Sequence, residues 1–189
     1  MNPALELEFS LRAERTPNPH SVKWVVSRTL VAGGGSASFD AAPTRDASPL
    51  AARLFAIDGV VGVFLASSFV TVTKRPDVEW PALAQPLVDA LKAFAASGEP
   101  ALGPAWNATR VRCEGGVEER IQRILDEEIR PYIAQDGGDV VFAGFRDGRV
   151  ELYMQGSCSG CPSSTATLKQ GIESRLREAV PEVQEVVAL

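Results

Sequence analysis

The hydrophobic pattern is clearest in the last third of the chain, where apolar residues at helical spacing predict an amphipathic helix over Gly116–Arg130. The apolar stripe of this helix consists of Val117, Ile121, Ile124 and Leu125. A hairpin follows, closed by Asp147 and Gly148, a pair typical of two-residue turns. A second helix is predicted over Pro162–Val180, and the final VQEVVAL can form one more strand. The predicted order of this part is therefore α-β-β-α-β.

The two-residue turn also predicts how the hairpin strands pair. Three apolar pairs then share one face of the hairpin: Phe145 with Val150, Ala143 with Leu152, and Val141 with Met154. A slip of one residue would turn every side chain to the opposite face. Because the turn and the alternation agree, the sequence favours this register.

The first half of the chain alternates between strand and helix patterns. Strands are predicted, in chain order, over Leu5–Ala13, Val22–Ser27, Ser36–Phe39 and, as a pair, within Gly59–Lys74. A helix is predicted over Ser48–Ile57, with Ser48 as its N-cap and a proline in its first position. A closing helix is predicted within Val78–Ser97, where Pro86 indicates a kink or a later start. The order β-β-(β)-α-β-β-α indicates an antiparallel sheet with helices on one face.

These patterns predict an α+β protein of two small α/β-sandwich-like domains. The first domain is expected to span residues 1–97 and the second residues 116–189, joined by a linker over 98–115 that is rich in Gly, Pro and Ala. Trp106 lies inside the linker and is expected to dock onto one of the domains. Cys113 lies near its end and is interpreted as a free thiol.

Composition narrows the function classes. Of 189 residues, 45% are hydrophobic and 23% are charged, as in globular proteins. The net charge of −5 argues against a nucleic-acid partner, and no apolar run approaches the roughly 20 residues that span a bilayer. The first fifteen residues resemble neither a signal nor a transit peptide, so a cytoplasmic location is expected. In a reducing compartment, paired cysteines indicate metal or redox chemistry more often than a structural disulfide.

The candidate chemistry lies in GSCSGCPSS, where Cys158 and Cys161 are spaced C-x-x-C between the hairpin and the predicted helix start at Pro162. Unpaired amides and the helix dipole favour thiolates at such a position, so two thiolates are expected on an exposed loop. Tetrahedral zinc and the common iron–sulfur clusters take about four protein ligands. A symmetric homodimer supplies four thiolates from two such motifs.

Other arrangements remain open on the residues alone. A single chain could reach four ligands only by adding Cys113 and His20 to the motif, which requires a site that spans both domains. The motif could also be the dithiol of a disulfide oxidoreductase, although such motifs usually follow the first strand of a βαβ unit. A zinc-stabilised interaction module would use the same four thiolates as a cluster-binding dimer.

At this point the motifs resemble a known family. The ordered series IRP, DGGD, DG, GSCSGCPSS and TLKQGIE is similar to the NifU C-terminal (NFU) domain. TPNPHSVKW and SPLAARLFAIDGVVGVFLASSFVTVTK are similar to the NFU N-terminal domain. The resemblance implies that Cys158 and Cys161 of two subunits hold one 4Fe-4S cluster between them, with 2Fe-2S as an alternative.

The resemblance also implies a carrier rather than an enzyme. Such a protein would receive clusters from upstream assembly proteins and deliver them to apo iron–sulfur client proteins. The TPNP stretch, Thr16–Pro19, is interpreted as an extended turn, with client docking as an alternative. QDGGD, Gln135–Asp139, is interpreted as a glycine turn, with an influence on iron binding or on the dimer contact as an alternative.

Overall fold

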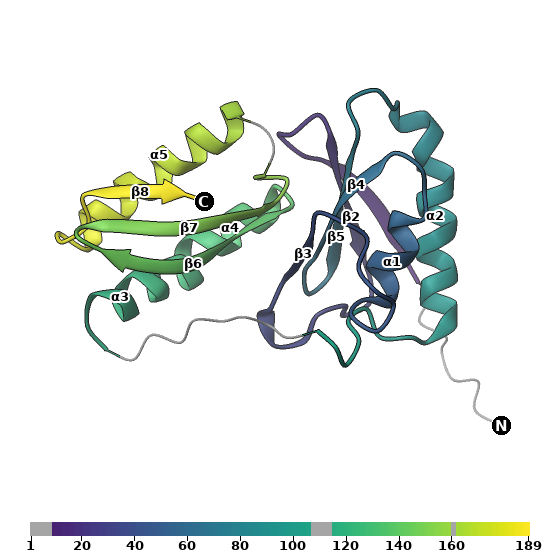
Figure 1. The fold of residues 1–189 in the computed structure, drawn as a ribbon, viewed down its shortest axis with the longest axis horizontal. Coiled ribbons are helices and arrows are strands. Elements are labelled where there is room, and N and C mark those ends of the chain that lie inside the picture. Colours follow the sequence, from purple (N-terminus) through teal and green to yellow (C-terminus); the bar gives the residue numbers. More distant parts are fainter. Residues whose placement is uncertain (1–8, 107–114, 160–161) are drawn as a thin grey trace.

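The fold consists of two sheets, each with its own helices, lying side by side (Figure 1). The structure is a computed structural model and describes residues 9–106, 115–159 and 162–189. We call residues 9–106 the N-terminal part and residues 115–189 the C-terminal part. The predicted boundaries at 97 and 116 stay a prediction, whereas the predicted α+β class is confirmed.

The N-terminal sheet has five antiparallel strands in the order β1-β2-β5-β4-β3. Their bounds are Leu11–Arg15 (β1), Ser21–Val26 (β2), Ala37–Phe39 (β3), Val60–Leu65 (β4) and Phe69–Lys74 (β5). A short 3-10 turn, η1 (Ala32–Gly34), precedes β3. Two helices, α1 (Pro49–Phe55) and α2 (Trp80–Ser97), cover the face turned away from the C-terminal part (Figure 1). The predicted antiparallel sheet with helices on one face is therefore confirmed.

Helix packing forms the larger core. Leu54 of α1 and Leu87 of α2 are fully buried against Val63 and Val72 of the sheet. The predicted cap is present, since Ser48 Oγ accepts a 3.0 Å hydrogen bond from the amide of Ala51. These contacts anchor both helices to a single sheet face.

Two features of the N-terminal part refine the sequence expectations. Helix α2 begins at Trp80 and continues through Pro86, so a later start after that proline is wrong. Trp106 docks as expected, with its ring centroid 5.2 Å from that of Phe39. The segment after α2 thus returns to the sheet edge.

The C-terminal part places helices beside a three-stranded sheet of order β6-β7-β8. Its elements are α3 (Gly116–Ile124), the π-helical turn η2 (Leu125–Ile129), α4 (Arg130–Gln135), β6 (Gly138–Arg146), β7 (Arg149–Gly156), α5 (Pro162–Ala179) and β8 (Glu185–Ala188). Strands β6 and β7 form the predicted hairpin, and β8 pairs with β7 in parallel. The order α-β-β-α-β is confirmed.

The first C-terminal helix runs five residues longer than predicted. It passes through the π-helical turn and ends at Gln135 rather than Arg130. Pro131 has no amide hydrogen to bond the carbonyl four residues earlier, and the π-helical turn ends just before this proline. The predicted stripe is largely confirmed, because Ile121, Ile124 and Leu125 are buried.

The hairpin register is only partly as predicted. Phe145 pairs with Val150, but a bulge between Phe142 and Gly144 then shifts the strands by one residue. Leu152 consequently pairs with Phe142, and Met154 pairs with Val140, instead of Ala143 and Val141. Phe142, in place of the smaller Ala143, is thereby buried together with Val140, Val150 and Leu152. Burial of the bulky side chains outweighed an unbroken ladder.

The second face of the N-terminal sheet contacts the C-terminal part. Phe64 and Phe69 on this face pack with Ala134 of α4, and β4 and β5 both contact β7. This contact brings the N-terminal sheet against the start and the end of the hairpin. Within the described residues, no helix is long and apolar enough to cross a bilayer.

Candidate functional site

Cys158 lies in the turn that follows β7, and its side chain points into the C-terminal core. Only 6% of the residue is exposed, and it packs among the buried residues between the hairpin and α5. A Cβ on Gly138 would collide with its Sγ and with the carbonyl oxygen of Gln155. Glycine at the start of β6 therefore makes room for the thiol.

Burial raises the pKa of the Cys158 thiol to about 11. The carboxylates of Asp136 and Asp139 raise this pKa further, while a long hydrogen bond to Ser157 Oγ at 4.0 Å opposes the shift. At neutral pH the side chain is thus a protonated thiol. The expectation of an exposed thiolate at Cys158 is wrong, because desolvation by the core outweighs any stabilisation by the helix start.

The turn formed by Ser157, Cys158 and Ser159, which we call the cysteine turn, is held by hydrogen bonds to the glycine turn of QDGGD. Ser157 donates through its amide to Gly137 O at 3.2 Å and through Oγ to Asp136 O at 2.6 Å. Gly137 has a φ of +79°, as the predicted glycine turn requires. Thr165 Oγ1 of α5 donates to Cys158 O at 2.8 Å. The two motifs that flank the hairpin therefore form one structural unit.

The acidic end of QDGGD has a structural partner. Asp139 is 5% exposed and accepts two hydrogen bonds of 2.7 Å from Arg130 Nε and Nη2. Arg130 also donates to Asp126 at 2.8 Å, and its pKa is raised chiefly by the hydrogen bonds that it donates to Asp139. This bidentate pair ties the start of β6 to α4.

The structure says less about the three other residues that were considered as ligands. Cys161 and Cys113 lie outside the described residues. His20 lies in the turn before β2, and its Nδ1 is buried with no hydrogen-bond partner in the described part of the chain. Among the described residues, no group of three or more His, Cys, Asp or Glu side chains could hold a metal ion. Assignment of Cys158 and Cys161 as cluster ligands therefore stays a prediction.

A groove of about 740 Å³ opens beside Cys158. Leu168 and Ile172 of α5 form one wall, and Ile129 of η2 and Tyr132 of α4 form the other. Tyr132, which lines the groove, is 66% exposed. The groove gives Cys158 its route to the surface.

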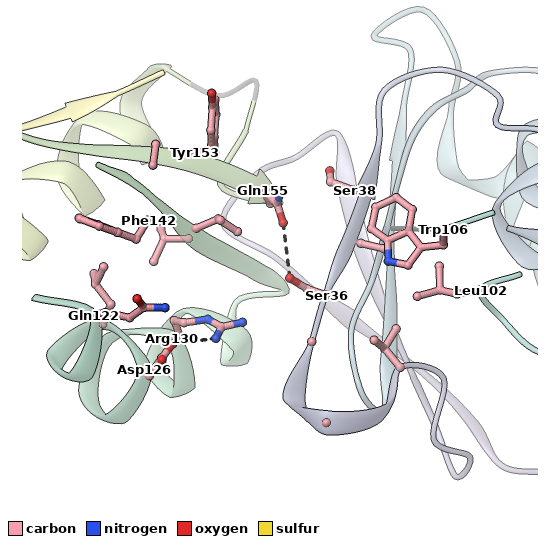
Figure 2. A pocket seen from close by; sticks show the side chains of 18 of the residues that line it. Ser36, Ser38, Leu102, Trp106, Gln122, Asp126, Arg130, Phe142, Tyr153 and Gln155 are labelled. Carbon is pink, nitrogen blue, oxygen red and sulfur yellow. Dashed lines mark hydrogen bonds and ion pairs between the residues drawn. The ribbon is translucent and has the colours of Figure 1, made fainter. Parts of the chain in front are cut away.

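A second cavity of about 750 Å³ lies at the junction of the two parts. Figure 2 shows Trp106 and Leu102 on its N-terminal side and Phe142 and Arg130 on its C-terminal side. Ser36 crosses the junction, donating to Asp139 Oδ2 at 2.7 Å and to Gln155 Oε1 at 3.5 Å. This cavity is separate from the cysteine turn.

Sequence reasoning missed the residues that contact the cysteine turn from the N-terminal part. Asn18, in the turn before β2, donates to backbone carbonyls on both sides of Cys158. The TPNP pattern was identified as a turn, but nothing in a local pattern shows where a turn docks. A buried Asn beside two prolines is the only signal, and burial is a property of the fold.

Comparison with known proteins gives two family matches. Residues 11–98 match the model of the scaffold protein Nfu/NifU N-terminal domain, and residues 121–187 match that of the NifU-like domain. The chain belongs to the NifU-like (NFU) family. Both predicted resemblances are confirmed, in the predicted order.

The curated relatives of this NFU chain are iron–sulfur proteins by name. It is 40% identical over 179 residues to the NFU1 iron-sulfur cluster scaffold homolog, mitochondrial, of Drosophila sechellia, and equally similar to that of Drosophila simulans. Each alignment covers 93% of this chain and 63% of the relative, so the chain spans less than two thirds of their length. A solved NifU-like protein from Saccharomyces cerevisiae is 20% identical and covers 55% of this chain and 94% of its own, with a TM-score of 0.47.

The expected cytoplasmic location is contradicted by these names. The relatives at 40% identity are named mitochondrial. The expectation rested on the composition of fifteen residues at the start of the printed sequence, and such a short stretch is weak evidence of location. The correction leaves the chemistry of the motif unchanged.

Proposed function

We propose that this NFU chain binds an iron–sulfur cluster as cargo and transfers it to apo iron–sulfur client proteins. The observation that carries the proposal is the C-x-x-C motif, set within residues 121–187 that match the NifU-like domain, in a chain whose relatives are named cluster scaffolds. Thiolates are the ligands that iron–sulfur clusters prefer. A carrier needs no catalytic turnover, and we therefore do not assign an enzymatic reaction.

The ligands are Cys158 and Cys161, and each chain holds half of the site. A 4Fe-4S cluster takes four cysteine ligands, so two motifs related by a two-fold axis complete it. A 2Fe-2S cluster would satisfy the same count. The dimer forms with the cluster, because neither chain alone supplies the ligands.

Loading requires the cysteine turn to change conformation. The inward thiol of Cys158, with its pKa raised to about 11, is a poor ligand until it leaves the core. Binding to iron removes the proton and compensates the loss of burial. The described turn is thus the resting state of a carrier that opens to load.

The raised pKa also weighs against a disulfide oxidoreductase. An attacking cysteine in such enzymes has a pKa near or below the ambient pH, whereas burial shifts Cys158 in the opposite direction. An oxidoreductase would be monomeric and would reduce insulin disulfides. A zinc module would retain stoichiometric zinc that iron and sulfide do not displace.

Anaerobic reconstitution with iron and sulfide tests the proposal. The wild-type chain should become brown, dimerise and bind about four irons per dimer. Cys158→Ser should lose the cluster, whereas the matched control Cys113→Ser, which removes a cysteine outside the motif, should keep it. Equal cluster content in Cys158→Ser and wild type would refute the assignment.

A further inference from the structure

Asn18 is a buried polar residue on the turn between β1 and β2, and only 1% of it is exposed. Its Oδ1 accepts a 2.9 Å hydrogen bond from the amide of His20, which identifies Nδ2 as the end that faces the C-terminal part. Thr16 Oγ1 braces the same turn by donating to Asn18 O at 2.9 Å and to Ser21 O at 3.0 Å. The side chain is therefore held rigidly toward the C-terminal part.

The Nδ2 group of Asn18 donates to two carbonyls of the cysteine turn. Its distance is 3.4 Å to Ser157 O and 3.2 Å to Ser159 O. These carbonyls belong to the residues immediately before and after Cys158. Fixing both restricts the backbone rotation that would turn Sγ out of the core. Asn18 therefore helps to set the direction in which the Cys158 side chain points.

Neighbouring donors of the same sheet face follow the same pattern. Thr71 Oγ1 donates to Gly137 O at 2.6 Å, and Lys23 Nζ donates to Gln135 O at 3.1 Å. Each donor is a side chain of the N-terminal part, and each acceptor is a backbone carbonyl of the QDGGD or cysteine turn. Of these three donors, Asn18 alone contacts the carbonyls that flank Cys158.

We propose that Asn18 is a positioning residue of the cysteine turn: it holds Cys158 inward, and its release lets the thiol turn outward to accept the cluster. The last clause rests on the proposed function, whereas the positioning of Cys158 does not. The N-terminal part is then a latch on the half-site. It keeps the thiol covered in the apo protein and opens as the cluster binds.

The first test measures Cys158 in the apo protein. Native alkylation with iodoacetamide, resolved by peptide mass spectrometry, gives the rate at Cys158 with Cys113 as an internal reference. Asn18→Ala removes two hydrogen bonds that favour the closed turn, so the rate at Cys158 should rise about tenfold. Ser36→Ala is the comparison variant, because it removes contacts between the two parts at Asp139 and Gln155 and leaves the bonds to the carbonyls that flank Cys158 in place.

A merely structural role would raise the rate in both variants in proportion to their loss of thermal stability. Positioning predicts a rise confined to Asn18→Ala and to Cys158. A rate within twofold of wild type in Asn18→Ala would overturn the proposal, as would an equal rise in Ser36→Ala.

Asn18→Asp separates the latch from the fold of the TPNP turn. Aspartate keeps an acceptor for the His20 amide but places a carboxylate oxygen opposite the two carbonyls. Hydrogen exchange over residues 152–159 should accelerate about tenfold, and this readout does not depend on thiol ionisation. Unchanged exchange would contradict the proposal even if Asn18→Ala fails to fold.

Cluster loading provides a third readout. Asn18→Ala should bind iron and sulfide several-fold faster than wild type and Ser36→Ala, since a larger fraction of its turns is open. If no variant binds a cluster while alkylation follows the prediction, the proposed function fails and the positioning of Cys158 stands. Equal loading rates with altered alkylation would overturn the coupling to the cluster.

Discussion

The two faces of the N-terminal sheet are covered in different ways. Alternation along β5 places Val70 and Val72 against α1 and α2, while Phe69 and Thr71 face the C-terminal part. The helix face is apolar except for Lys74 at the end of β5, whose ammonium lies over the Trp80 ring of α2. The other face combines two phenylalanines with side chains that donate hydrogen bonds to backbone carbonyls of the turns around Cys158. One face supplies stability, and the other couples the sheet to the candidate site.

This difference has a physical basis. Apolar burial is not directional and is proportional to area, so the helix face can hold a fold but cannot orient one turn. Hydrogen bonds are directional, and their net contribution to stability is small. A face built from donors is therefore suited to positioning and to release.

The largest effect is expected on the helix face. Leu87→Ala leaves a cavity where a fully buried side chain packs between α2 and the sheet. Unfolding in urea should show a loss of about 2–5 kcal/mol in stability. Alkylation of Cys158 below the transition should keep its wild-type rate. A change below about 1 kcal/mol, or a selective rise at Cys158, would contradict the division between the faces.

The buried thiol of Cys158 makes the unfolding free energy depend on pH, with an effect similar in size to that of Leu87→Ala. The folded pKa of Cys158 is raised to about 11, above the usual value near 8.5, so the protonated thiol is favoured in the folded state. Its contribution is complete below about pH 8.5 and is lost as the pH rises toward 11, by up to about 3 kcal/mol. The measurement is unfolding free energy from pH 7 to 11. Cys158→Ala should lose this component of the slope, and identical slopes would contradict the burial.

Lys23→Met tests the sheet face that contacts the C-terminal part, at the buried cation of that face. The Lys23 Nζ forms an ion pair with Glu14 at 3.1 Å and donates to Gln135 O, so methionine removes this donor from Gln135 O and leaves Glu14 paired with Arg12 alone. The cost should be about 1–3 kcal/mol in unfolding free energy. Lys92→Met, on a residue outside this face, is the control. An equal effect in both variants would refute a specific role for Lys23.

Thr71→Val should have the smallest effect. Valine matches threonine in shape and removes only the 2.6 Å hydrogen bond to Gly137 O, which still accepts from the amide of Ser157. A loss of about 0.5–1.5 kcal/mol is expected by chemical unfolding. Thr73→Val, on the same strand, removes a hydroxyl that bonds Ser21 Oγ within the N-terminal sheet, so it distinguishes a junction effect from a strand effect. A larger loss in Thr73→Val would contradict this interpretation.

Much of the fold follows from local patterns. The capped start at Ser48, the paired strands of β4 and β5 and the helix beginning at Pro162 were all predicted, because each depends on neighbouring residues. The bulge at Ala143 was missed since the turn at Asp147 and Gly148 permits an unbroken ladder equally well. The packing of Phe142 decides between them, and packing is not visible in a local window.

The site shows the same limit more strongly. The C-x-x-C spacing and the helix start were visible, and they indicated an exposed thiolate. Cys158 is buried because Gly138 and α5 close around it and Asn18 holds its turn, and both Gly138 and Asn18 are distant from the motif in sequence. Local chemistry predicts what a motif can bind, whereas long-range contacts determine whether its cysteine is buried or exposed.

Native mass spectrometry of the anaerobically reconstituted chain tests the central claim most directly. We predict one species with the mass of two chains and one 4Fe-4S cluster, which dissociates to monomers when the cluster is removed. A cluster-loaded monomer, or a dimer that persists without iron and sulfide, would contradict a half-site completed by a second copy of the chain.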